Sequence, residues 1–158
     1  MPGIFERSRL SASQLRTVAK QRYDDAECLR ESGKNARANG VFYLGGFVIE
    51  CLLKARLLAQ YPTVAAKRNP AELSKSDRVI WKLIFVSHEL DAMLSKLPDI
   101  STQMQAAKSH SGAGALANLN RICGEWTIFA RYSTQSATMH EASRFLDNIK
   151  ELIPWLEQ

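Results

Sequence analysis

The chain has 158 residues and a formal net charge of +5, and 46% of its residues are hydrophobic. A chain of this length usually forms one domain and buries an ordinary core without disulfides or metals. The modest positive charge permits binding to RNA or another polyanion without requiring it. No apolar run reaches about 18 residues without a charge, so the sequence predicts no membrane-spanning helix.

The cysteines and the N-terminal residues indicate a cellular compartment. Cys28, Cys51 and Cys123 lie in apolar helical contexts, and no pair has the spacing of metal ligands. Such a pattern favours free thiols in a reducing environment. Residues 1–7 lack the apolar run of a signal peptide. We therefore expect a cytoplasmic protein with no metal and no other cofactor.

The first two helices are predicted from residues that typically start or end a helix. Residues 1–10 show no periodicity and are expected to form a loose arm before a single domain over residues 11–158. Ser11 and Gln14 have the spacing of a capping box, and Gly33 is a typical helix stop, so a helix is predicted between them. A second helix is predicted from between Asn35 and Asn39 to about Tyr61. The short connection predicts that the two helices pack antiparallel.

Residues 43–57 within the second helix are apolar on nearly every side, which is typical of a helix at the centre of a domain. Gly45 and Gly46 are unfavourable inside a helix and suggest the close approach of another helix. Glu50 and Lys54 have the favourable order for a helical ion pair. A carboxylate buried here needs a partner, so we predict that Lys54 or Arg131 lies within salt-bridge reach of Glu50.

The remainder of the chain alternates helical periodicity with breaks. Residues 62–76 are predicted to form a loop, whose basic residues are either simply solvated or bind a polyanion. Ser76 is predicted to cap a short helix, and His88 to open another that Pro98 closes. Residues 99–114 are predicted to be a polar break, and residues 116–130 a helix. Thr138 and Glu141 form a second capping box, and Pro154 is expected to kink the final turn.

No segment shows the alternation of a strand, so the predicted fold class is all-α. We expect an antiparallel four-helix bundle with additional short helices. An excess of apolar surface on so small a bundle also suggests a homodimer.

Four parts of the sequence resemble the HEPN family, the nucleotide-binding helical domains of higher eukaryotes and prokaryotes. Residues 43–55 resemble the second helix of these domains, and Asp25-Ala26 with Leu29 and Gly33 resembles the end of the first. His88-Glu89-Leu90 resembles the family's His-Asp-Leu turn. Trp126, followed by Arg131-Tyr132, resembles its late tryptophan and Arg-Tyr pair. The similarity extends over roughly residues 13 to 157.

The resemblance implies a function and partners. A groove between the central helix and the Arg131 turn would bind a nucleotide or an RNA end, with Glu50, Lys54, His88, Arg131 and Tyr132 as the binding residues. The resemblance also implies a homodimer. A small nucleotidyltransferase would be a further partner, in a bacterial or archaeal toxin–antitoxin or defence system.

The alternative function is that of a metal-independent ribonuclease toxin. Catalytic HEPN domains carry an arginine, four to six intervening residues and a histidine, which suits proton transfer beside a phosphate held by a guanidinium. No histidine of this chain has an arginine at that distance, and eight residues separate Arg131 from His140. In the alternative, Arg131 and His140 of two subunits face each other across a dimer. Otherwise Arg131 pairs with an acid such as Glu50, and His140 lies in an exposed first turn.

Overall fold

The secondary structure is entirely helical in the part of the chain that this computed structural model describes, residues 9–107 and 110–158. The side chains of His110, Ser111 and Arg131 lie outside the description. Within these limits there is no strand, which confirms the all-α prediction. No helix of the described part is long and apolar enough to cross a membrane.

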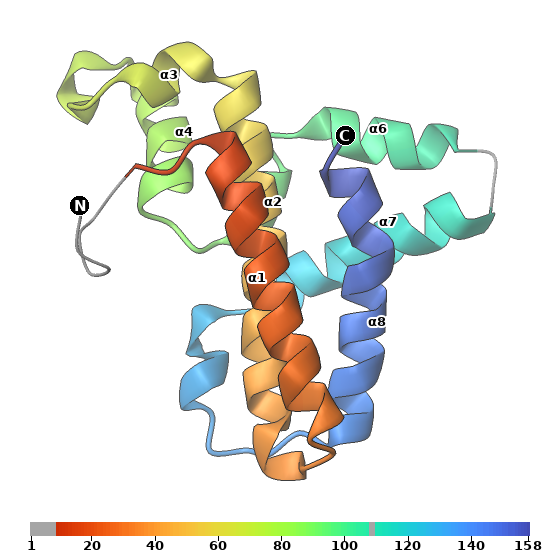
Figure 1. Cartoon of the computed structure of the whole chain (residues 1–158). Helices are drawn as coiled ribbons and strands as arrows, with labels where there is room; N and C mark the ends of the chain where they lie inside the picture. Colours follow the sequence, from red (N-terminus) through yellow and green to blue (C-terminus); the bar gives the residue numbers. More distant parts are fainter. Residues whose placement is uncertain (1–8, 108–109) are drawn as a thin grey trace.

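Three long helices run side by side (Figure 1). These are α1 (Ala12–Glu31), α2 (Ala38–Gln60) and α8 (Met139–Leu156). The chain descends α1 and ascends α2, so the two are antiparallel as predicted, and they share the most extensive contact in the structure. Helix α8 packs on α2 as well, which leaves α2 covered from two directions.

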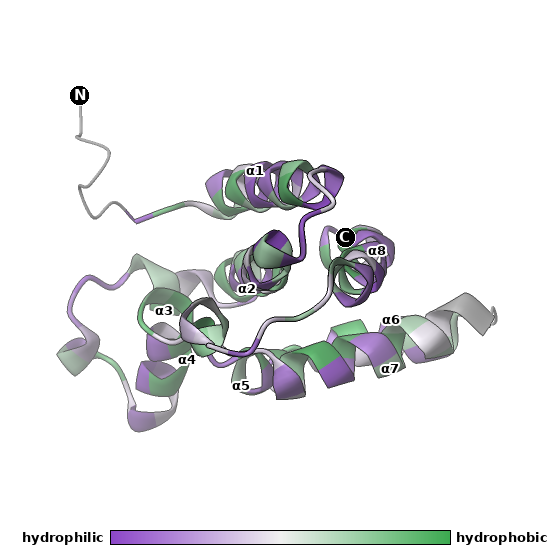
Figure 2. Ribbon diagram, turned by 90° about the horizontal axis from the view of Figure 1, so that it is seen from below, coloured by the Kyte–Doolittle hydropathy of each residue, from purple (hydrophilic) through white to green (hydrophobic). Residues whose placement is uncertain are grey.

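The fourth long helix has a different orientation. Helix α7 (His110–Glu125) and the shorter α6 (Pro98–Ala106) run across the other three rather than along them, in both Figure 1 and Figure 2. Helix α5 (Leu90–Leu94) packs between α2 and α7. The expectation of an antiparallel four-helix bundle therefore remains a prediction, whereas the helical class is established.

The ends of α1 and α8 follow from local hydrogen bonds. The Ser11 and Thr138 side chains accept from the backbone N–H of Gln14 and Glu141, whose side chains accept in return, so both predicted capping boxes are confirmed. Helix α1 ends at Glu31, and Gly33 has a φ of 64°, a conformation that glycine adopts without strain. Pro154 lies inside α8, which continues to Leu156.

Helix α2 contributes more buried residues to the core than any other helix of the described part, with Ile49, Leu53 and Leu57 fully buried. A Cβ atom at Gly46 would overlap the indole of Trp126, and one at Gly45 would meet the ring of Phe145. The glycines thus admit two aromatic side chains. The expected close approach of another helix is therefore not what these glycines serve, because aromatic side chains occupy the space.

The predicted loop at 62–76 and the predicted break at 99–114 are both wrong, because Pro62, Pro70 and Pro98 each begin a helix or a 3₁₀ turn. The predicted loop 62–76 contains α3 (Pro62–Ala66), the 3₁₀ turn η2 (Pro70–Glu72) and the start of α4 (Lys75–Phe85). The predicted break at 99–114 contains α6 and the beginning of α7. Proline has no N–H to lose in the first turn of a helix and favours that position. We name residues 62–85 the α3–α4 lobe.

Several boundaries also differ from prediction. Ser74, not Ser76, caps α4, and its Oγ accepts from the N–H of Asp77. His88 precedes α5, which begins only at Leu90. Helix α7 ends at Glu125, and a separate 3₁₀ turn, η3 (Ile128–Tyr132), follows it. Another such turn, η1 (Asn35–Arg37), leads into α2.

Candidate functional site

Glu50 is a buried acid in the middle of α2, and its side chain is only 3% exposed. Lys54, one turn further along the same helix, donates to Glu50 Oε1 at 2.7 Å. This contact confirms the prediction that Lys54 or Arg131 pairs with Glu50, and it does so through Lys54. The side chain of Arg131 lies outside the described residues. A carboxylate this deeply buried needs such a partner, because an isolated buried charge is very unfavourable.

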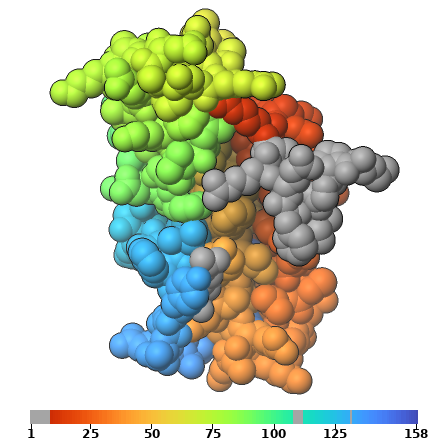
Figure 3. Space-filling model, turned by 90° about the vertical axis from the view of Figure 1, so that its left-hand side faces the viewer, coloured from red at the N-terminus to blue at the C-terminus, as the bar shows by residue number. Residues whose placement is uncertain are grey.

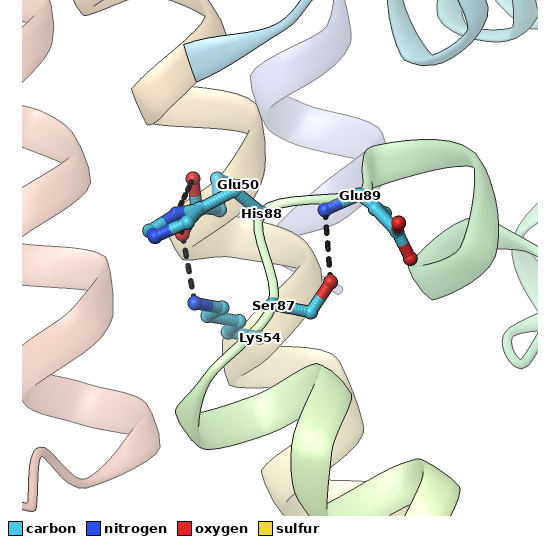
Figure 4. A network of polar contacts seen from close by, with 5 residues as sticks. All are labelled: Glu50, Lys54, Ser87, His88 and Glu89. Atoms are coloured by element: carbon cyan, nitrogen blue, oxygen red, sulfur yellow. Dashed lines mark hydrogen bonds and ion pairs between the residues drawn. The ribbon is translucent and has the colours of Figure 1, made fainter.

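His88 is the second partner of Glu50 (Figure 4). Its Nδ1 lies 3.0 Å from Glu50 Oε1 and 3.1 Å from Oε2. The loop between α4 and α5 positions the ring. Lys82 O accepts from the N–H groups of Val86 and Ser87, and Ser87 Oγ accepts from the N–H of Glu89. The side chain of His88 is 42% exposed, so an acid inside the fold holds a histidine that still reaches the surface.

The Glu50 cluster lines a groove of about 740 Å³. Helices α1, α2 and α4 provide its walls, and Figure 3 shows α2 in the middle of this face of the molecule, between α1 on one side and α4 on the other. Three aromatic side chains contribute, Phe47, Trp81 and Phe85. Trp81 is fixed by a 2.9 Å hydrogen bond from its Nε1 to Lys67 O.

The groove carries an excess of positive charge. Arg9, Lys54 and Arg68 line it against the single carboxylate of Glu50. The Arg9 guanidinium stacks over Phe85 at 4.5 Å and donates to the carbonyl oxygens of Ala65 and Arg68. Within the described residues, neither Arg9 nor Arg68 has an acidic partner. The groove is therefore suited to an anion that also carries a ring.

The cysteine of the groove, Cys51, is buried. Burial raises the pKa of the Cys51 thiol to about 12, and the charge of Glu50 adds to the effect. A thiol with so high a pKa remains protonated at neutral pH, and only the thiolate is reactive. Among the described residues, no three His, Cys, Asp or Glu side chains lie together as metal ligands do.

The other predicted site residues lie elsewhere. Tyr132, in η3, is 66% exposed and does not line the groove. Arg131 belongs to the same turn by its backbone. His140 is exposed in the first turn of α8, where the neighbouring Met139 N–H donates to Asn35 Oδ1 before α2 begins. Ala38, the first residue of α2, precedes Glu50 by twelve residues, about 18 Å along the helix axis. Within one chain, His140 therefore does not join the Glu50 cluster.

The segment around η3 borders a different cavity, of about 640 Å³. Trp126 reaches it from the end of α7, and its Nε1 donates to Phe42 O at 3.1 Å. Asn39 ties the following segment to α2, since its side chain donates to Gln135 O and accepts from the N–H of Ala137. The predicted single groove between the central helix and the Arg131 turn is thus divided, and the cluster of charged residues belongs to the α4 side.

Searches against protein-family models, curated proteins and solved structures gave no match. Among the groove residues, Arg9, Phe47, Trp81 and Phe85 escaped the sequence-based site prediction. Arg68 belongs to the basic stretch in the expected loop, so its charge was a usable signal. Arg9 gave no signal, because it lies in the expected arm and reaches the groove only through the tertiary fold.

Proposed function

We propose that the chain is a HEPN-like module that binds a nucleotide or an RNA end in the groove formed by α1, α2 and α4. The observation that carries this proposal is the Glu50–Lys54–His88 cluster on the wall of a cationic, aromatic-lined groove. Cationic side chains suit phosphate groups, and aromatic rings provide stacking surfaces for bases. Glu50 holds Lys54 and His88 in place, so less freedom is lost when a ligand binds.

The resemblance to HEPN domains supports this assignment at the level of residues. The resemblance rests partly on Glu50 and Lys54 in the central helix and on His88 in a distant turn, and the fold brings these three side chains into contact. We propose that α1, α2, α8 and the crossing α7 correspond to the four helices of such a bundle. A homodimer and a small nucleotidyltransferase partner, in a toxin–antitoxin or defence system, belong to the same proposal.

The test is equilibrium binding of AMP and of short RNA, measured by calorimetry and fluorescence anisotropy. Arg9→Ala and Arg68→Ala remove exposed cations of the groove without unpairing Glu50. A charge-assisted hydrogen bond is worth about 1.5–3 kcal/mol, so each change is expected to weaken binding at least roughly tenfold. Lys150→Ala, an exposed change on α8, is the matched control. If the wild-type protein binds neither ligand, the proposal is wrong.

A second function, metal-independent RNA cleavage, is favoured by the way Glu50 contacts His88. The carboxylate engages Nδ1, which leaves Nε2 available to exchange a proton. Nε2 would take the proton of a ribose 2′-hydroxyl as its oxygen attacks the adjacent phosphorus. The bond from phosphorus to the 5′-oxygen breaks, and that oxygen takes up a proton from water. The products are a 2′,3′-cyclic phosphate and a 5′-hydroxyl.

The ribonuclease alternatives differ in the histidine they require. The version with Arg131 and His140 needs a second copy of the chain to face the first, whereas the His88 version uses one groove. Incubation of total RNA with the protein in EDTA distinguishes them. Cleavage that His88→Ala abolishes and His140→Ala preserves supports the groove, and the reverse result supports the dimeric pair. If the protein binds RNA without cleaving it, both ribonuclease alternatives are wrong and the binding module remains.

A further inference from the structure

Positive charge is concentrated in the α3–α4 lobe. Its 24 residues include five basic and two acidic side chains, a net charge of +3 out of the +5 of the whole chain. The last twenty residues, which include α8, have four acidic and two basic side chains and a net charge of −2. Glu72 pairs with Lys67, whereas Asp77 keeps its charge and accepts from Ser74 Oγ. The remaining cations outnumber Asp77, so the lobe carries a positive field.

Three of these cations form a stripe along α4. Lys75, Arg78 and Lys82 are spaced three and four residues apart, so they lie on one face of the helix, and all three are exposed. None has an acidic partner within residues 9–107 and 110–158. The stripe extends about 10 Å along the helix axis. This length exceeds what a single phosphate group would require.

The stripe continues into the groove. Trp81 and Phe85 follow Arg78 and Lys82 by three residues each, so the face of α4 that lines the groove adjoins the face that carries the stripe. Arg68 also lines the groove from within the lobe. The lobe stands at the upper end of the face that contains the groove in Figure 3. The positive surface is thus continuous from the groove to the outside of α4.

We infer that the ligand is a single-stranded polynucleotide, with one base in the groove and its backbone running out across the α4 stripe. This inference rests on the proposed function and specifies its substrate class. The phosphate of a mononucleotide bound in the groove would not contact cations outside it, whereas a strand places successive phosphates along them. A base that packs against the aromatic wall of the groove, where Arg9 already lies over Phe85, must be free of a duplex, which favours a single strand.

The experiment compares AMP with single-stranded RNA and DNA 12-mers and with a duplex 12-mer, all by anisotropy or competition at several salt concentrations. The single strands are expected to bind at least roughly tenfold more tightly than AMP, with a steeper salt dependence. Lys75→Glu/Lys82→Glu is expected to weaken 12-mer binding and to lower the salt slope by about 0.7 for each lost contact, while AMP binding stays unchanged. Lys150→Glu is the control, and circular dichroism verifies folding.

The outcomes separate this inference from the function on which it rests. Equal affinity for AMP and the 12-mers, a preference for duplex, or a 12-mer affinity that the stripe variant leaves unchanged overturns the inference but retains the nucleotide site. Strand binding that Arg9→Ala and Arg68→Ala leave unchanged overturns both, because the strand then bypasses the groove. The RNA and DNA arms show whether the sugar is recognised.

Discussion

At the scale of single residues, the decisive feature is a carboxylate placed where hydrophobic side chains would otherwise pack. Glu50 is 2% exposed as a whole residue, and Leu53 and Leu57 on the same face of the helix are fully buried. Lys54 and His88 offset the desolvation of Glu50. A buried ion pair of this kind contributes little net stability, although the loss of one partner is costly. A role in a binding site therefore explains the buried Glu50–Lys54 pair better than a contribution to stability does.

Glu50→Gln is expected to lower the free energy of unfolding by about 3 kcal/mol, because Lys54 then remains buried without its counter-charge. Glu50→Gln/Lys54→Met should recover most of this loss, since no charge then remains at position 50 or 54. Urea unfolding monitored by circular dichroism measures both, with the exposed Glu151→Gln on α8 as the control. A double variant no more stable than the single one would contradict the ion-pair explanation.

At the scale of elements, packing against α2 depends on the absence of a side chain at Gly46. A methyl group there would displace the Trp126 indole and break its hydrogen bond to Phe42 O. Gly46→Ala is expected to destabilise the protein by about 1–3 kcal/mol, as overpacking does. Gly114→Ala has free space and lies within α7, so it is expected to stabilise by about 0.4–1 kcal/mol. Thermal unfolding of the two variants should therefore shift in opposite directions.

The two capping boxes differ in charge and therefore in pH dependence. The N–H and Oγ–H of Thr138 both donate to Glu141 Oε2, and these bonds hold the pKa of the Glu141 carboxyl below its ordinary value. A carboxyl whose pKa is lower in the folded chain than in the unfolded chain stabilises the fold, and this stabilisation is complete at a pH above the unfolded pKa. The stabilisation is lost as the pH falls through the folded pKa. Ser11 is partnered by Gln14, which does not titrate.

Thr138→Ala is therefore expected to cost about 1 kcal/mol at neutral pH and less in acid, whereas the cost of Ser11→Ala should not change. Urea unfolding of both variants from about pH 7 to about pH 3 covers the range in which glutamate carboxyls titrate. Parallel pH profiles for the two variants would show that the charge of Glu141 has no part in the cap.

The success of sequence-based prediction also varies by element. Periodicity and capping boxes predicted α1, α2 and α8 well, because their stabilising contacts lie within a few residues of one another. Pro62 and Pro98 misled the prediction. Each was interpreted only as the end of a helix, although it is also the first residue of the next one. Glu50, Lys54 and His88 were predicted as site residues. The groove wall formed by Arg9 and Trp81 was not, because only the tertiary fold brings residues 9 and 81 together.

At the scale of the whole molecule, exposed apolar side chains indicate a contact surface. Phe129 and Tyr132 in η3 are 70% and 66% exposed, and Val86 beside the groove is 60% exposed. Surfaces of this kind are often buried against a second copy. We expect a homodimer in sedimentation at tens of micromolar, and Phe129→Ser should shift it towards monomer without altering the helical signal. A wild-type monomer across that range would rule out the dimer.

The groove joins the most enclosed helix of the domain to one of its least anchored parts. The amides at the centre of α2 should exchange with solvent only on global unfolding, whereas α3 and α4, of five and eleven residues, should open locally and more often. A ligand held by both walls would slow exchange in α4 while leaving α2 unchanged. Release would then await the opening of the lobe, so the ligand's residence time would report on how often α4 detaches from α2.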